Sequence, residues 1–122
     1  MKVNQYPRPW SWAQEARPRR LSEWACAPKT NGFYELGYMT EGRFEAKYCG
    51  RAAGVTLATR LRQHHVYSHN PKVRRYSNKL WYRCKSFKTF ELAAYVEALH
   101  LAALEYAWNE RNEWRQHWAL ED

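Results

Sequence analysis

The chain has 122 residues, of which 45% are hydrophobic, and this length and composition predict one domain around one compact core. Its 20 Lys and Arg against 12 Asp and Glu give a formal net charge of +8, which favours an anionic partner. No apolar run is long enough to span a bilayer and the first residues lack a signal-peptide core, so we expect no membrane partner.

The chain has three cysteines, Cys26, Cys49 and Cys84, which are widely spaced and odd in number. They form neither a disulfide framework nor a zinc-ligand pattern, and each is expected to be a small buried apolar residue. This usage favours a reducing compartment, so we expect a cytoplasmic protein. A prokaryotic or phage-like setting is a separate expectation.

Residues 1–30 are predicted to form an irregular basic and aromatic arm. Four of the five prolines lie there, and prolines at this density interrupt long elements. One short helix is expected near Ser11–Ala16. The three tryptophans of the arm argue against plain disorder, so the arm is expected either to pack on the domain or to reach along a nucleic acid.

Two strands joined by a turn are predicted next, over Gly32–Tyr38 and Phe44–Gly50. Their apolar alternation fixes which side chains share a face. With a five-residue loop at Met39–Arg43, the same pattern sets Tyr34 directly opposite Tyr48 on the neighbouring strand.

Thr56 is predicted to cap a helix that runs to about Val66. Two leucines and two charge-capable side chains fall on one face of this helix: Leu57, Arg60, Leu61 and His64. Because the leucines must face the sheet, the two polar side chains are expected to point inward or along the rim of the sheet.

The rest of the chain is predicted to form a loop over Val66–Asn78, a third strand over Lys79–Lys85 and a long helix from Phe90 to about Trp108, capped by Thr89. Four apolar residues are expected on the buried face of that helix: Leu92, Val96, Leu99 and Ala103. Residues 110–122 are expected to form a helical tail, with Trp114 and Trp118 on one side.

The predicted fold class is therefore α+β. A three-stranded antiparallel sheet flanked by helices is expected over residues 31–109, with the arm before it and the tail after it.

Positive charge is concentrated in the middle of the chain, with eleven Lys and Arg and no Asp or Glu between Ala46 and Phe90. Aromatic residues are interleaved with these cations, which is typical of nucleic-acid binding. A basic surface that is only solvated and binds no partner would have the same excess of Lys and Arg. The candidate phosphate-binding residues are Arg62, Lys72, Arg74 and Arg75.

Two tripeptides in the predicted strands are followed by polar residues at helix-compatible positions. The series is Gly32-Phe33-Tyr34, Tyr48-Cys49-Gly50, Arg60, His64, Glu97 and Asn109. It resembles the catalytic domain of the GIY-YIG nuclease family, whose members cut phosphodiester bonds with one divalent metal ion. Phe33 and Cys49 replace the isoleucines of the family name. The histidine at position 64 resembles the one found in the restriction-type members of the family.

The resemblance implies a metal-dependent endonuclease. Double-stranded DNA is the expected substrate, and branched DNA and RNA stay open on the sequence. It implies that Tyr34 is the general base toward the attacking water and passes its proton to His64. Since a free tyrosine has a pKa of about 10, this role requires nearby cations and the metal to lower that pKa. Arg60 is implied to hold the scissile phosphate and stabilise the transition state.

Glu97 is implied to be the protein ligand of a single Mg²⁺ or Mn²⁺ ion, with water at most remaining positions. Tyr48 is implied to support catalysis, and Asn109 to orient the phosphate and contact the nucleic acid. A nuclease of this size that cuts both strands must act twice or pair with a second copy, so a homodimer on the substrate is a further expectation.

Two other classes of function stay open on the sequence. The first is a catalytically inactive GIY-YIG-like module that only binds nucleic acid, which would present the same basic surface. The second is a basic domain that contacts a protein or a ribosome. Binding alone needs no acidic residue near the phosphate, so the presence of Tyr34, Arg60, His64 and Glu97 together favours the nuclease.

Overall fold

The computed structural model describes residues 17–109. The predicted helix at Ser11–Ala16 and the predicted tail helix at 110–122 lie outside them. The elements, in chain order, are β1 (Arg19–Arg20), the 3-10 helix η1 (Leu21–Cys26), β2 (Gly32–Thr40), β3 (Arg43–Ala52), α1 (Leu57–Tyr67), α2 (Pro71–Tyr76), the 3-10 helix η2 (Ser77–Lys79), β4 (Trp81–Ser86) and α3 (Phe90–Ala103).

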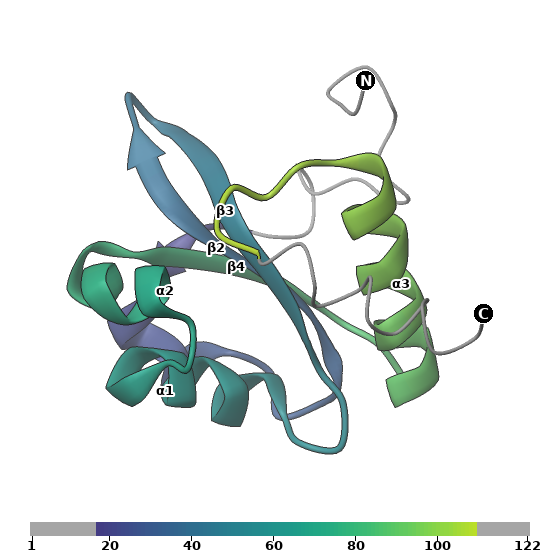
Figure 1. The fold of residues 1–122 in the computed structure, drawn as a ribbon. Helices are drawn as coiled ribbons and strands as arrows, with labels where there is room; N and C mark the ends of the chain where they lie inside the picture. The colour runs from purple at the N-terminus through teal and green to yellow at the C-terminus, as the bar shows by residue number, and fades with distance from the viewer. Residues whose placement is uncertain (1–16, 110–122) are drawn as a thin grey trace.

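The sheet is antiparallel with strand order β1-β4-β2-β3, and this confirms the α+β class. Helices α1 and α2 lie on one side of the sheet and α3 on the other (Figure 1). One apolar core lies between the sheet and α1, and a smaller one lies beneath α3.

The prediction of three strands was wrong, because β1 adds a fourth strand next to β4. Arg19 pairs with Tyr82 and Arg20 with Trp81, and the backbone N–H of Leu21 donates to the Leu80 carbonyl at 2.8 Å. Leu21 is fully buried, so this part of the expected arm belongs to the core. A two-residue strand is too short to show an alternating pattern, which is why the sequence did not reveal it.

The turn between β2 and β3 is shorter than predicted. Thr40 pairs with Arg43, which leaves only Glu41 and Gly42 in the turn, with φ of 52° and 79°. Two positive φ angles identify the type I′ geometry that matches the twist of a hairpin. The expected five-residue loop at Met39–Arg43 was therefore wrong.

A bulge in β3, opposite Leu36 and Gly37, completes the difference in register. Leu36 pairs with Tyr48 and Gly37 with Ala46, which leaves Lys47 as the extra residue. The register shifts there, and a Cβ on Gly37 would overlap the carbonyl oxygen of Glu45. Glycine is the residue that permits so close an approach of two strands. As a result Tyr34 lies opposite Gly50 and not opposite Tyr48, although both tyrosines stay on the predicted common face.

Helix α1 matches its prediction closely, since Thr56 accepts a hydrogen bond from the Thr59 backbone at 3.1 Å and the helix ends at Tyr67. The predicted loop at Val66–Asn78 instead contains α2. The Asn70 side chain caps α2, and Pro71 follows at its first position. This Asn-Pro pair is a helix-start signal that the loop prediction overlooked.

Helix α3 begins as predicted, with Thr89 accepting from the Leu92 backbone at 3.2 Å, but it ends at Ala103 rather than near Trp108. Its buried face is also rotated. The buried residues are Ala93, Val96 and His100, whereas Leu92 is 43% exposed.

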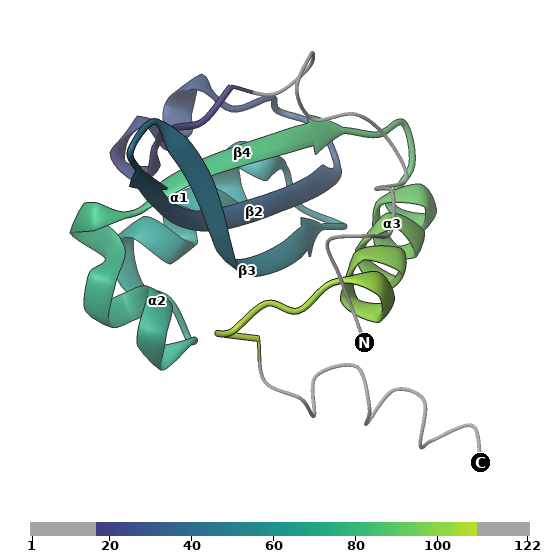
Figure 2. The ribbon, with the colours of Figure 1, turned by 90° about the horizontal axis from the view of Figure 1, so that it is seen from above.

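The chain after α3 runs beside the outer edge of β3, as Figure 2 shows in yellow, and closes in a turn in which the Asn109 backbone N–H donates to the Tyr106 carbonyl at 3.1 Å. The Trp108 backbone N–H donates to the Lys47 carbonyl at 2.8 Å, and the Asn70 side chain donates to the Trp108 carbonyl at 2.8 Å. This stretch therefore covers part of the sheet edge that a longer α3 would have left open.

The part of the chain that the structure describes contains no helix with the length and apolar character needed to cross a membrane.

Candidate active site

Tyr34 lies in the centre of the sheet on β2, with 1% of its surface exposed. Its hydroxyl forms a buried hydrogen bond of 2.7 Å with Nε2 of His64 on α1. Gly50 on β3 makes room for the ring, because a Cβ at that position would overlap the Tyr34 hydroxyl. The two glycine-tyrosine tripeptides therefore meet through the ring of one and the glycine of the other.

His64 continues the hydrogen-bond chain away from Tyr34. Its Nδ1 lies 2.7 Å from Oγ of Ser68, and that oxygen also accepts the backbone N–H of Asn70 at 3.1 Å. When Nδ1 carries the hydrogen and donates to Ser68, Nε2 is the acceptor for the Tyr34 hydroxyl. In this tautomer His64 can take a proton from Tyr34.

Burial sets the protonation of both partners. It lowers the pKa of His64 to about 3, with smaller contributions from His69 and Arg60, so the imidazole is neutral near pH 7. Burial also raises the pKa of Tyr34 well above its usual value, and the Tyr48 phenol adds to this while Arg60 opposes it. The expected lowering of the Tyr34 pKa by nearby cations is therefore absent, because desolvation outweighs Arg60.

Two further predicted residues border this pair. The Tyr48 ring packs edge-on against His64, with centroids 5.4 Å apart. Arg60 on α1 is partly buried and donates from Nη1 to Gln63 at 3.0 Å. Its Nε is buried without a hydrogen-bond partner among residues 17–109. A buried donor of this kind is costly unless an acceptor satisfies it, and a phosphate oxygen would be one.

Glu97 approaches the site from α3. Its Oε1 lies 2.7 Å from Nη1 of Arg51 on β3, and the two side chains are 16% and 49% exposed. The Glu97 carboxylate is close enough to Tyr34 to contribute to the raised pKa of its phenol. Arg51 was missed in the sequence because only the fold brings it to α3.

The ability of the site to hold a metal depends on Glu97. Residues 17–109 contain no group of three or more His, Cys, Asp or Glu that could hold a metal ion. A hard divalent cation can still bind through one carboxylate when water and substrate phosphate supply the other oxygens. Glu97 fits that kind of site, with Arg51 as a competing cation.

Asn109 fastens the stretch after α3 to the sheet. Its Oδ1 accepts the Cys49 backbone N–H at 2.9 Å and its Nδ2 donates to the Cys49 carbonyl at 3.0 Å. Both ends of the amide thus bind the edge of β3 next to Gly50. The predicted contact of Asn109 with nucleic acid stays a prediction.

A buried ionic group, also missed in the sequence, holds the same stretch from beneath. Glu35 is fully buried and accepts from Arg83 Nε at 2.7 Å and from the Tyr106 hydroxyl. A buried carboxylate requires such partners. The signal in the sequence for a buried Glu35 was its position in a predicted strand, next to Tyr34.

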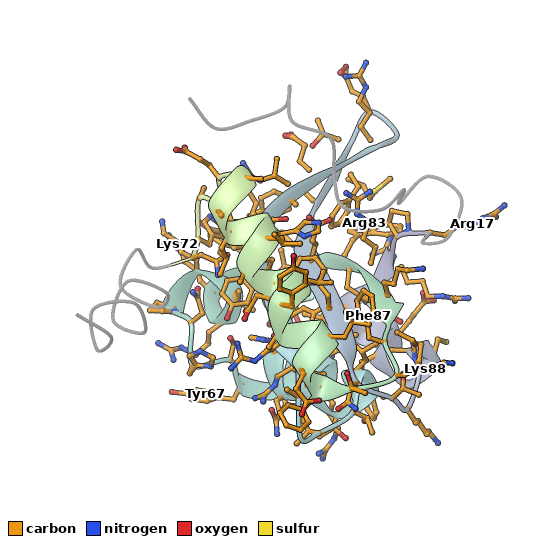
Figure 3. The ribbon with its side chains drawn as sticks, turned by 90° about the vertical axis from the view of Figure 1, so that its right-hand side faces the viewer. Arg17, Tyr67, Lys72, Arg83, Phe87 and Lys88 are labelled. Atoms are coloured by element: carbon orange, nitrogen blue, oxygen red, sulfur yellow. The ribbon has the colours of Figure 1, made fainter. Side chains whose placement is uncertain are left out.

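The four basic residues predicted to bind phosphate are all exposed: Arg62, Lys72, Arg74 and Arg75. Arg74 lies over the exposed ring of Tyr67, 5.0 Å from its centroid. Figure 3 shows Tyr67 and Lys72 on one flank of the molecule and Arg17 and Lys88 on the other.

Comparisons of the chain with models of protein families, with curated proteins and with solved structures gave no match. The function is therefore inferred from the site itself. The structure brings Tyr34, Tyr48, Arg60 and His64 together and places Glu97 within electrostatic range of Tyr34.

The low pKa of His64 predicts how stability depends on pH. Between pH 6.5 and 3 the unfolded chain binds a proton at this residue and the folded chain does not, so the free energy of unfolding falls as pH falls. From pH 7 to pH 5 the loss due to His64 should be about 2 kcal/mol. Urea unfolding at the two pH values should show this loss in the wild type and a smaller one in His64→Gln. Equal losses in the two proteins would mean that His64 titrates normally in the folded state.

Proposed function

We propose that this chain is a metal-dependent endonuclease of the GIY-YIG type that hydrolyses phosphodiester bonds in double-stranded DNA. The observation that supports this most strongly is the buried 2.7 Å hydrogen bond between Tyr34 and His64, with Arg60 and Glu97 beside it. A phenol whose proton faces a neutral imidazole is arranged to pass that proton on.

In the proposed reaction a water oxygen attacks the phosphorus. Tyr34 takes a proton from that water while its own phenolic proton moves to Nε2 of His64, and the P–O bond to the leaving oxygen breaks. The proton that the leaving oxygen needs comes from solvent. Glu97 would hold a divalent cation, which would supply charge neutralisation on the phosphate and on the leaving oxygen. Coupling the two proton transfers avoids a free phenolate, which the raised pKa of Tyr34 disfavours. It leaves a protonated His64, whose low pKa requires that the negative charge of the bound phosphate stabilise the imidazolium.

Arg60 is proposed to bind the scissile phosphate. Its buried Nε provides a donor that the phosphate would satisfy, and a fixed guanidinium stabilises the extra negative charge of the transition state. Tyr48 is proposed to hold the His64 ring in place through their edge-on contact. Asn109 is proposed to position β3 beside the phosphate.

Arg60→Ala should weaken both DNA binding and cleavage, because the same guanidinium serves docking and the transition state. We expect the dissociation constant for DNA to rise several-fold and the cleavage rate at saturating DNA to fall by about a hundredfold. Anisotropy titration and single-turnover cleavage measure the two effects. A variant that bound DNA more weakly yet cut at the wild-type rate would make Arg60 a docking residue only.

The substrate is proposed to lie along the flank formed by α2. Mutating Arg74 and Arg75 together to glutamine should reduce the slope of log affinity against log salt concentration by about two. Arg17 and Lys88 lie on the opposite flank and provide a matched double variant with the same loss of charge (Figure 3). Equal slopes for the two double variants would show that α2 is only a solvated basic face.

The inactive binding module remains the second candidate, favoured by the raised pKa of Tyr34 and by the Arg51 contact at Glu97. Incubation with supercoiled plasmid, with and without Mg²⁺, separates the two functions. Nicking that requires Mg²⁺, with cut ends that map to defined positions on the plasmid, supports the nuclease. Salt-sensitive binding with no nicking in Mg²⁺ or Mn²⁺ identifies the binding module. A homodimer on the substrate and a cytoplasmic location stay predictions.

A further inference from the structure

Arg51 lies on β3, the edge strand of the sheet, next to residues of the proposed site. It follows Gly50, the glycine beneath the Tyr34 ring, and its backbone pairs with Phe33. Neighbouring strand residues point to opposite faces, so Arg51 projects toward α3 while Gly50 faces Tyr34. There its guanidinium holds the Glu97 carboxylate at 2.7 Å.

Oε1 of Glu97 accepts the Arg51 guanidinium at 2.7 Å, so a divalent cation that binds the same carboxylate is repelled by the adjacent positive charge. The two cations therefore compete for Glu97. With half of the Arg51 side chain exposed, the ion pair is of the kind that contributes little to stability, so a divalent ion can displace it. A displaced Arg51 would leave an unpaired guanidinium on β3, one residue from the glycine that lies against the Tyr34 ring.

We propose that Arg51 couples metal binding to nucleic-acid binding. It holds and orients Glu97 until a divalent cation arrives, and the cation then releases it to grip a substrate phosphate beside Gly50. This inference rests on the proposed nuclease function and adds Arg51 to its positioning residues. A guanidinium suits both partners, because its planar array of donors matches carboxylate and phosphate alike.

The coupling must act in both directions. If the metal frees Arg51 for the phosphate, DNA strengthens metal binding by the same factor by which metal strengthens DNA binding. Without DNA, the closed pair lowers the apparent metal affinity, because only chains with a released Glu97 can bind the ion. For an ion pair this exposed, that reduction is about twofold to fivefold.

The first experiment measures Mn²⁺ binding without DNA, by the loss of the free-ion paramagnetic resonance signal. Arg51→Gln should bind Mn²⁺ about twofold to fivefold more tightly than the wild type. Arg51→Lys keeps the charge and the competition, so its affinity should stay near that of the wild type. Lys88→Gln removes one exposed positive charge elsewhere and controls for net charge. Glu97→Gln should lose the site.

The second experiment measures DNA affinity by anisotropy with and without Ca²⁺, used as a divalent probe. The gain in DNA affinity caused by Ca²⁺ should be large in the wild type and at least threefold smaller in Arg51→Gln. Arg51→Lys should also show a reduced gain, because an ammonium cannot bind a phosphate through two donors. Without any metal, Glu97→Gln should bind DNA more tightly than the wild type, and adding Arg51→Gln should remove that gain.

The outcomes distinguish this inference from the proposed function. If Glu97→Gln leaves Mn²⁺ binding unchanged, the proposed metal site itself is wrong. If Mn²⁺ binds through Glu97 but Arg51→Gln matches Lys88→Gln, the competition is absent and the inference is overturned while the nuclease proposal stands. If Arg51→Gln tightens Mn²⁺ binding but keeps the full Ca²⁺-driven gain in DNA affinity, Arg51 does not reach the substrate, and the coupling is likewise overturned.

Discussion

Glu97→Gln should lower the rate of metal-dependent DNA cleavage by at least about a thousandfold, or about 4 kcal/mol in the barrier. The substitution keeps the size and shape of the side chain but removes the negative charge that attracts a hard cation. A neutral amide oxygen is a much weaker ligand for Mg²⁺, and residues 17–109 contain no cluster of His, Cys, Asp or Glu that could replace it.

DNA binding by Glu97→Gln should stay intact or become slightly tighter. One negative charge disappears beside the phosphate, and Arg51 loses the carboxylate that it holds at 2.7 Å. Plasmid nicking over time measures cleavage, and anisotropy in the presence of a chelator measures binding. Glu91→Gln, at an exposed position on the same helix, is the matched control and should cut normally. Wild-type cutting by Glu97→Gln would make Glu97 an ordinary surface charge and require another metal site.

Local signals in the sequence predicted helix starts well. Thr56 and Thr89 both cap helices because the cap depends on a hydrogen bond within three residues. The end of α3 was missed because the following residues leave the helix to pair with β3, and the Trp108–Lys47 hydrogen bond joins positions far apart in the sequence. Tertiary pairing decided that boundary, and helix propensity did not.

The register of β2 and β3 shows how a small local feature changes a site. A two-residue turn at Glu41–Gly42 and a bulge opposite Gly37 together placed Gly50, and not Tyr48, opposite Tyr34. The glycines were the available signals, since an isolated glycine in a strand indicates a bulge or a close approach. The common face of the two tyrosines survived because the one-residue shift from the shorter turn and the one-residue shift at the bulge cancel in the side-chain alternation.

Some residues of the site were predicted from sequence motifs, and others were revealed only by contacts between distant elements. The order of motifs pointed to Tyr34 and His64, and the structure places them in hydrogen-bond contact. Arg51 was not predicted, because its role depends on a partner from another element. The direction of the Tyr34 pKa also lay beyond the sequence, since it follows from burial, and the nearby Arg60 charge alone suggests the opposite shift.

Tyr34→Phe should reduce cleavage by about a hundredfold to ten-thousandfold, the range for loss of a positioned general base. The change removes only the hydroxyl, so the ring still lies over Gly50 and the sheet keeps its packing. His64 keeps its bond to Ser68 but loses the partner of Nε2, which should lower the free energy of unfolding by about 1–3 kcal/mol.

Tyr82→Phe is a matched control for this loss of stability. Tyr82 is a buried tyrosine of the same core, and its hydroxyl donates to the Glu23 carbonyl at 2.9 Å. Both variants should unfold at lower urea concentration than the wild type, but only Tyr34→Phe should lose cleavage when the rates are compared under conditions where each protein is fully folded. Should Tyr34→Phe cut as fast as Tyr82→Phe, the buried Tyr34–His64 bond would be a structural link in the core, and the water would have to be activated by another group.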